Sequence, residues 1–438
     1  MHFRNILWNL AGLGLPLLIA ALTVPKLLTL IGPERFGFLA LAWGLIGYAG
    51  ALDLGIGRAI TQRISVLRGG ADNEQIPDVV ATAVRITLVT GGVGMVLIVI
   101  AALSGAYRLI HADMVPAAEI ELSMLLLGLA LPMQAISASY RGVNEAYLNF
   151  KSINILRLFL GAANFGAPFL VALYTNQVHW LVATLVLSRC LALVFYRRCA
   201  HHCMVKEGHI RRGNYGKQFA RSLLQFGGWF TLSSMVSPFL VQADRFFVGA
   251  LISASAVTLY VIPYEVTVQT LLFVGAVTTV AFPVITHLIH SAPQQAAATF
   301  QLWLYRVTGL MLMLMAVLAW VMPYLLHLWI GPQLTEASVR VGQILCIGVF
   351  FNAIGAMYFA LLHAYGKTKM TAMLHLAELP FFIAALYVLI SHYGVAGAAI
   401  AWVLRMAVDT LALVVMARII KQQKFIGLGE STLRGTHE

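Results

Sequence analysis

The feature that most constrains this chain is a series of long apolar runs that carry isolated charges. Twelve charged residues lie inside these runs: Lys26, Asp53, Arg58, Arg85, Arg157, Arg189, Asp244, Arg245, Glu265, Glu378, Arg405 and Asp409. A charge at the centre of a bilayer costs roughly 2.5–3.5 kcal/mol on insertion scales. We therefore expect most of these side chains to face a shared polar interior, which indicates transport of something charged.

Composition places the apolar runs in a membrane. Of the 438 residues, 60% are hydrophobic and only 11% are charged, whereas a soluble domain carries about 25% charged residues. The net charge of +12 would suit nucleic acid, but cationic residues also accumulate in the cytoplasmic loops of membrane proteins. Because the sequence indicates no soluble basic domain, we expect membrane lipids as partners and no nucleic acid.

Windows of about 20 apolar residues predict twelve membrane-spanning helices. The predicted spans are 5–31, 36–63, 79–104, 120–140, 147–174, 178–197, 219–250, 255–288, 302–329, 339–364, 370–391 and 395–418. The first window is longer than the core of a signal peptide, which has about 7–15 residues, so we interpret it as a retained helix. The predicted fold class is all-α integral membrane protein.

Basic residues gather in alternate connections. Most Lys and Arg follow the second, fourth, sixth and tenth spans or lie in the C-terminal tail, and seven of them lie between residues 197 and 221. The positive-inside rule then predicts that both termini are cytoplasmic. Six spans precede the long basic connection and six follow it, so we expect the two halves to be parallel repeats. We predict a six-helix lobe at 1–200, a basic linker at 201–218, a second six-helix lobe at 219–420 and a cytoplasmic tail at 421–438.

Asp53 and Arg58 are five residues apart in the segment LDLGIGRA and lie near one another on one side of a helix. Gly55 and Gly57 allow another helix to approach closely. The Gly-x-Gly pattern follows no strand, so it does not indicate a nucleotide-binding loop. Arg58, like Arg85 and Arg157, has an alternative interpretation in which its long side chain simply reaches the membrane interface.

The second half of the chain carries charged pairs. Arg405 and Asp409 are four residues apart and can pair directly on one helix, either as a structural ion pair or at a substrate site. Asp244 and Arg245 are adjacent and point in different directions, so we expect one of them to face a cavity. Glu265 is a candidate proton-coupling carboxylate, unless a cation such as Arg245 pairs with it.

These residues fall into two candidate groups. Basic side chains can bind an anionic head group, whereas acidic ones can orient them or couple ions. The substrate-binding candidates are Lys26, Arg58, Arg157, Arg189, Arg245 and Arg405. The coupling or orienting candidates are Asp53, Asp244, Glu265, Glu378 and Asp409.

Motifs of enzymes and metal sites are missing. No His-Glu-x-x-His, Gly-x-Ser-x-Gly or P-loop occurs, so the driving force is expected from an ion gradient, the membrane potential or downstream consumption of the product rather than from ATP hydrolysis. Cys199 and Cys203 lie beside His201 and His202, but no second ligand pair follows at a zinc-site spacing. We predict reduced thiols, no metal, no cofactor and no enzymatic activity.

Four stretches, in their order and spacing, resemble the polysaccharide transporter (oligosaccharide flippase, Wzx-like) family of the multidrug/oligosaccharidyl-lipid/polysaccharide (MOP) flippase superfamily. They are LIGPERFGFLA at 30–40 with LDLG at 52–55, QADRFFVG at 242–249, AFPVI at 281–285, and LWIGP at 328–332 followed by AYGKTK at 364–369 and GVAGAA at 394–399.

The resemblance implies two six-helix lobes around a central cavity that opens alternately to each side. It also implies a substrate, an oligosaccharide linked to undecaprenyl pyrophosphate, of the O-antigen or exopolysaccharide kind, that crosses the bacterial inner membrane. A polysaccharide polymerase complex is a possible partner, and H⁺ or Na⁺ a possible coupling ion.

Two other functions compete with this interpretation. A multidrug exporter of the same superfamily would expel cations and should have mostly acidic embedded charges, whereas seven of the twelve here are basic. A membrane enzyme acting on lipid-linked sugars would need a substantial outer loop, and the predicted outer loops are short.

Overall fold

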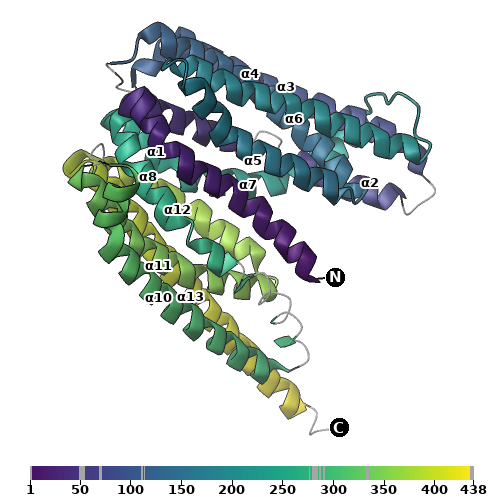
Figure 1. The fold of residues 1–438 in the computed structure, drawn as a ribbon. Helices are drawn as coiled ribbons and strands as arrows, with labels where there is room; N and C mark the ends of the chain where they lie inside the picture. Colours follow the sequence, from purple (N-terminus) through teal and green to yellow (C-terminus); the bar gives the residue numbers. More distant parts are fainter. Residues whose placement is uncertain are drawn as a thin grey trace. The chain divides into compact units, whose positions relative to one another are not determined.

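The computed structural model of the chain is helical, with no strand among the residues that it describes (Figure 1). These residues are 2–48, 55–68, 72–109, 112, 114–275, 277–278, 285, 288–289, 292–331 and 335–434. Within these residues, nine segments are long and apolar enough to cross a membrane. The prediction of an all-α fold is confirmed, whereas the arrangement of twelve spans in two lobes remains a prediction.

The chain forms two compact units, unit 1 at 1–258 and unit 2 at 259–438, and each is described by itself. The helices of unit 1 are α1 (His2–Tyr48), α2 (Ile56–Arg68), α3 (Ile76–Leu103), α4 (Ala117–Ala146), α5 (Phe150–Ala172), α6 (Val178–Lys206) and α7 (Lys217–Leu251). Short 3-10 turns at Asn73–Gln75 and Ala106–Leu109 flank α3. Helix α8 (Ala254–Val268) begins in unit 1 and continues into unit 2.

Helix α1 differs from the two spans predicted for it. Gly32 has φ 79° and ψ 166°, so the helix is interrupted where the first predicted span ends. The predicted second span at 36–63 is divided between two helices, because α1 is described to Tyr48 and α2 starts at Ile56. Gly55 precedes α2 with φ 66°, a left-handed conformation that glycine adopts without steric cost.

Unit 1 is held together by close helix packing. Helix α4 packs against both α3 and α6, α5 packs against α1 and α6, and α2 lies on α4 (Figure 1). A Cβ on Gly142 of α4 would lie 2.2 Å from the carbonyl oxygen of Gly57 on α2. The hydroxyl of Thr61 donates to the carbonyl of Gly142 at 3.0 Å. Helices α2 and α4 therefore approach closely at Gly57, and the missing side chain that this contact requires is that of Gly142.

The basic connection after α6 is anchored to the start of α3. The backbone N–H of Asn214 and the guanidinium of Arg211 both donate to the carboxylate of Asp78, each at 2.6 Å. The N–H of Gly216 donates to the hydroxyl of Thr82 at 3.0 Å. Helix α6 itself continues nine residues past the predicted end of its span at 197, because the apolar window stops while residues that favour helix continue to Lys206.

Unit 2 contains α10 (Pro293–Trp329), α11 (Glu336–Ala364), α12 (Thr368–Tyr393) and α13 (Val395–Arg434). Helix α11 packs against α10 and α13, and α12 packs against α13. The ring of Trp402 on α13 packs directly against Gly348 of α11. A Cβ at position 348 would lie only 2.4 Å from the indole. Helices α11 and α13 therefore lie close together at this point.

Candidate functional site

The candidate residues of unit 1 have very different environments. Asp244 is fully buried and Arg245 is 4% exposed, and Arg189 is half-buried. The remaining basic candidates have exposed side chains: Lys26, Arg58, Arg85 and Arg157. Asp53 lies outside the described residues. The predicted neighbourhood of Asp53 and Arg58 is therefore still a prediction.

Arg189 joins the central helices of unit 1. Its terminal nitrogen donates to the side-chain oxygen of Asn164 on α5 at 3.2 Å. The backbone carbonyl of the same Asn164 accepts a hydrogen bond from the indole N–H of Trp43 on α1 at 3.1 Å. The Nε of Arg189 is buried and has no hydrogen-bond acceptor among the described residues. A buried donor without an acceptor costs about 1–3 kcal/mol, so this position favours an anionic ligand.

Three arginines surround Tyr196, a buried side chain on α6. Arg141 of α4, Arg157 of α5 and Arg189 of α6 are its electrostatic neighbours, together with Glu145. Arg141 lies 3.7 Å from Glu145 and has this carboxylate as its partner. For Arg157 and Arg189, no carboxylate of the described residues lies within ion-pair distance. We call Arg157, Arg189, Asn164 and Tyr196 the unit 1 basic cluster.

Asp244 and Arg245 lie near the end of α7. The backbone N–H of Arg245 donates to the carboxylate of Asp244 at 2.8 Å. This part of α7 approaches α1, since a Cβ on Gly44 would lie 3.3 Å from the amide oxygen of Gln242 and 3.7 Å from Phe246. Asp244 and Arg245 are thus buried beside the contact of α7 with α1, and a role in a cavity remains a prediction for both.

The candidate residues of unit 2 form a second cluster on α12 and α13. The Nε of Arg405 lies 3.6 Å from a carboxylate oxygen of Glu378, which is ion-pair distance but longer than a hydrogen bond. The guanidinium of Arg405 also covers the ring of Phe382, at 5.2 Å from its centroid. The carboxylate of Asp409 is a further electrostatic neighbour of Glu378. Arg405 therefore pairs with a carboxylate on another helix, whereas its pair with Asp409 on its own helix remains a prediction.

We call Glu378, Arg405, Asp409 and His375 the unit 2 acidic cluster, and a second histidine, His363, lies beside it. The Nε2 of His375 lies 3.4 Å from the carboxylate of Asp409. The ring of His375 stacks on Phe359 of α11 with an interplanar angle of 3°. Phe359 also contacts the ring of His363, whose Nε2 lies 3.1 Å from the hydroxyl of Thr371. The carboxylates, one guanidinium and His375 thus gather on α12 and α13, and the ring of Phe359 on α11 separates them from His363.

Sequence analysis missed the two histidines, because scattered histidines are most often incidental. A signal was present, however: His375 precedes Glu378 by three residues, so both lie on one face of α12. Arg405 and Asp409 share one face of α13 in the same way. The pairing of these two faces was not visible in the sequence. Glu265, the other acidic candidate of unit 2, is half-buried on α8.

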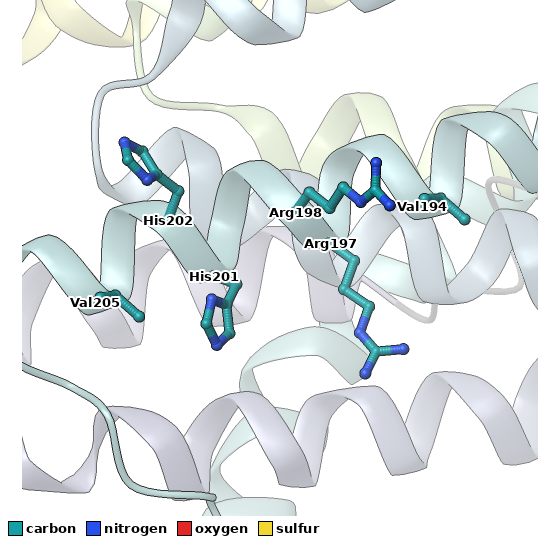
Figure 2. A pocket seen from close by; sticks show the side chains of 6 residues that line it. All are labelled: Val194, Arg197, Arg198, His201, His202 and Val205. Atoms are coloured by element: carbon teal, nitrogen blue, oxygen red, sulfur yellow. The ribbon is translucent and has the colours of Figure 1, made fainter.

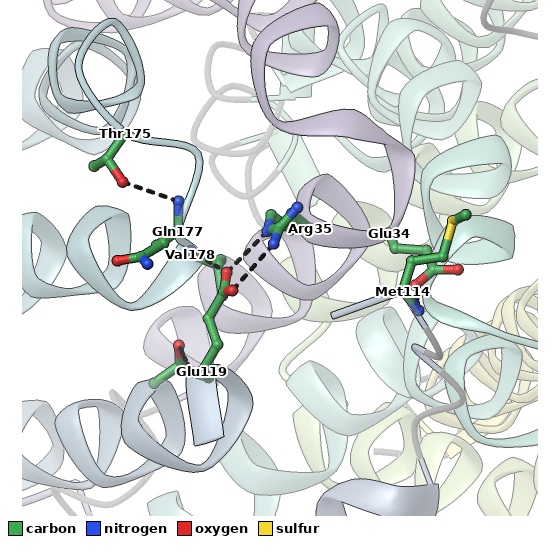
Figure 3. A network of polar contacts seen from close by, with 8 residues as sticks. Glu34, Arg35, Met114, Glu119, Thr175, Gln177 and Val178 are labelled. Carbon is green, nitrogen blue, oxygen red and sulfur yellow. Dashed lines mark hydrogen bonds and ion pairs between the residues drawn. The ribbon is translucent and has the colours of Figure 1, made fainter. Parts of the chain in front are cut away.

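Sequence analysis also missed an ion pair at the end of unit 1 that is predicted to face outward. Figure 3 shows that Arg35 of α1 donates to both carboxylate oxygens of Glu119 of α4, at 2.9 and 3.1 Å. The N–H of Val178, at the start of α6, donates to the same carboxylate at 2.5 Å. These hydrogen bonds raise the pKa of Arg35, although burial opposes this. Glu119 therefore joins α1, α4 and α6.

Comparison with known proteins identifies the family. The polysaccharide biosynthesis protein family matches residues 3–289. The chain belongs to this family. A relative from Shigella flexneri, named "Putative O-antigen transporter", is 28% identical over 410 residues, covering 94% of this chain and 96% of that protein. The predictions of a polysaccharide transporter and of a protein that is not an enzyme are confirmed.

Solved structures share the fold of this polysaccharide transporter. An inward-facing multidrug resistance MATE transporter of the MOP superfamily superposes with a TM-score of 0.73 at 14% identity, covering 94% of this chain and 97% of that chain. A MOP superfamily transporter from Pyrococcus furiosus, with a binding pocket of reverse polarity, has a TM-score of 0.61 at 14% identity, covering 94% and 93%. The protein is thus a multi-pass membrane protein of the bacterial inner membrane.

Proposed function

We propose that this protein is a flippase that moves an oligosaccharide linked to undecaprenyl pyrophosphate from the cytoplasmic to the periplasmic leaflet by alternating access. The oligosaccharide is an O-antigen or exopolysaccharide repeat unit. Membership of the polysaccharide biosynthesis family supports this, as does the similarity to an O-antigen transporter. Both termini and the basic connections face the cytoplasm, two six-helix lobes divide at residues 201–218, and a polymerase complex receives the product.

The observation that carries the proposal is the incomplete partnering of Arg189. Its Nε is buried without an acceptor, and Arg157 lies on the adjacent helix with no described carboxylate beside it. Guanidinium groups match the geometry of phosphate oxygens and bind them with charge-assisted hydrogen bonds. We assign the pyrophosphate to Arg189 and Arg157, with Lys26, Arg58 and Arg245 as further contacts along the path.

The acidic cluster of unit 2 supplies the coupling in this proposal. Glu378, Asp409 and His375 are close enough that a proton on one changes the charge felt by the others. Histidine changes charge near neutral pH, at about 6.5 in water. We therefore assign H⁺ rather than Na⁺ as the coupling ion. Arg405 neutralises Glu378 and fixes its position.

The same acidic cluster favours a second candidate, an ion-coupled multidrug exporter. Buried carboxylates can bind a cationic drug, and the MATE transporter with the same fold is a multidrug resistance protein. The two candidates differ in their substrates and so in phenotype. A deletion strain that accumulates lipid-linked repeat units on the inner leaflet identifies a flippase. A deletion strain that becomes sensitive to cationic drugs, with normal surface polysaccharide, identifies an exporter.

Complementation of a flippase-deficient strain tests the binding assignment. We expect Arg189→Ala and Arg157→Ala to lose most surface polysaccharide at normal protein levels, and Arg189→Lys to recover part of it. Arg340→Ala is a matched control, because Arg340 is 72% exposed and lies four residues from its partner Glu336. If Arg189→Ala, Arg157→Ala, Arg245→Ala, Lys26→Ala and Arg58→Ala all restore polysaccharide to the level of the control, the binding assignment is wrong.

A further inference from the structure

The cytoplasmic part of α6 carries a hollowed basic face that the proposed function does not use. Figure 2 shows Arg197 and His201 pointing to one side of this helix, and Arg198 and His202 to the other. Val194 and Val205 lie at the two ends of the hollow, which has a volume of about 390 Å³. All six side chains are exposed. We call these six residues the α6 basic face.

The charges of this face are available to an external anion. Other arginines in this part of unit 1 have carboxylate partners: Arg68 pairs with Glu207, Arg141 with Glu145 and Arg211 with Asp78. Among the described residues, no carboxylate lies within ion-pair distance of Arg197 or Arg198. Arg197 and Arg198 thus differ from the neighbouring arginines, whose charges are already neutralised by carboxylates.

The surface that leads to this face is apolar. Leu187, Leu191 and Val194 are 58%, 49% and 43% exposed. Their spacing of four and three residues puts them on one stripe of α6, which continues into Arg197, Arg198 and His201. A stripe that changes from exposed apolar to exposed basic residues along one helix matches the profile of a lipid, with acyl chains above and a charged head group below.

We propose that the α6 basic face binds the phosphate of an anionic phospholipid, with the acyl chains lying along Leu187, Leu191 and Val194. In the proposed topology this lipid belongs to the inner leaflet. Arg197 and Arg198 approach the phosphate from opposite sides of the hollow, and His201 and His202 extend the basic surface toward the cytoplasm. Arg189 of the unit 1 basic cluster is not part of this face, because it is half-buried and donates to Asn164 on α5.

Binding of defined lipids to the purified full-length protein in detergent tests this proposal. Native mass spectrometry would measure phosphatidylglycerol and phosphatidylcholine bound to the wild type. The variants are the double variant Arg197→Ala/Arg198→Ala, its charge-conserving form Arg197→Lys/Arg198→Lys, and Arg108→Ala/Arg340→Ala. The last variant removes the same charge from positions outside this face.

We expect the wild type to prefer phosphatidylglycerol. The alanine pair on α6 should bind it about 30-fold more weakly, because each basic residue near a membrane surface contributes roughly fivefold. The lysine pair and the control should bind like the wild type. The proposal is overturned if the wild type does not discriminate between the two lipids, or if both alanine pairs weaken binding equally.

Two further results would assign the site to another source of phosphate. Displacement of the lipid by inorganic pyrophosphate at equal concentration would indicate a site for a soluble anion, and so would overturn the lipid assignment. A strong preference for a polyprenyl pyrophosphate over phosphatidylglycerol, lost in Arg197→Ala/Arg198→Ala, would make this face part of the substrate path instead. Persistence of the phosphatidylglycerol preference beside both competitors supports the proposal.

Discussion

The two units carry opposite kinds of embedded charge. In unit 1 the embedded candidates are mostly basic, with Lys26 and five arginines against Asp53 and Asp244. In unit 2 they are mostly acidic, with Glu265, Glu378 and Asp409 against Arg405, and two histidines join them. If both units had embedded charges of the same sign, both could bind the same kind of ligand. The difference suggests a division of labour in which unit 1 binds an anion and unit 2 binds protons.

The partnering of the charges differs as well. In unit 2, Arg405 lies at ion-pair distance from Glu378 and Asp409 lies at that distance from His375, so each of these two carboxylates has a basic partner, although both oxygens of Glu378 lack a hydrogen bond among the described residues. In unit 1, Arg189 makes one hydrogen bond to a neutral amide and keeps its Nε without an acceptor among the described residues. A balanced network can exchange protons within itself, whereas an unbalanced cation favours a ligand that brings negative charge.

The largest effect is expected at the ion pair of unit 1 that is predicted to face outward. Glu119→Gln removes the charge that Arg35 requires and weakens the bond from Val178, and Glu119 is only 6% exposed. Breaking a buried ion pair costs about 3–5 kcal/mol, and we expect the lower end because Arg35 is 20% exposed. Thermal unfolding of the purified protein in detergent would measure this loss. An unchanged unfolding temperature would show that α1, α4 and α6 hold together without the pair.

The second prediction compares one arginine from each unit. Arg189→Gln should weaken binding of a polyprenyl pyrophosphate by about 10-fold to 150-fold, because hydrogen bonds to charged groups contribute about 1.5–3 kcal/mol. Arg405→Gln should change this affinity little, since the carboxylate of Glu378 already neutralises the charge of Arg405. Binding titrations in detergent with both variants would measure the difference. Equal losses for the two would end the assignment of head-group binding to unit 1.

The third prediction concerns the acidic cluster. In proteoliposomes, transport by the wild type should respond to a pH gradient, up to about tenfold in the lipid distribution per pH unit for one coupled proton. Asp409→Asn and Glu378→Gln should lose this response while they retain affinity for the head group. Arg189→Lys is the matched control, because it should retain the response at reduced affinity. A pH response that survives in both carboxylate variants would place coupling elsewhere in the chain.

The fold class was predictable from the sequence, because long apolar windows and rare charges leave a membrane as the only consistent solvent. Exact boundaries were less predictable. Gly55 starts a new helix inside the predicted second span, and α6 continues through Arg198 to Lys206 beyond an apolar window. Hydropathy reports where lipid begins and ends, whereas helix ends depend on backbone conformation and on contacts outside the membrane.

The candidate residues were predictable one by one, but their groupings were not. The energetic argument about embedded charges identified Arg189, Glu378, Arg405 and Asp409. It did not identify His375 or Glu119, because histidine is common outside sites and Glu119 lies at the edge of a predicted loop. Which helices meet is set by packing, such as Trp402 against Gly348. A single sequence shows neither that contact nor the Arg35–Glu119 pair.

The smallest effect is expected at the counterpart of Glu119 in unit 2. Glu336 also lies in the first turn of a helix and also pairs with an arginine, Arg340, but at 3.5 Å on the same helix and with 91% of the side chain exposed. Exposed pairs four residues apart contribute about 0.3–0.5 kcal/mol, so Glu336→Gln should leave thermal unfolding nearly unchanged. High salt should remove even this small difference, because exposed pairs are screened. If Glu336→Gln destabilises the protein as much as Glu119→Gln does, the stability of both units depends on acidic side chains at helix starts, and the two units differ only in their embedded charges.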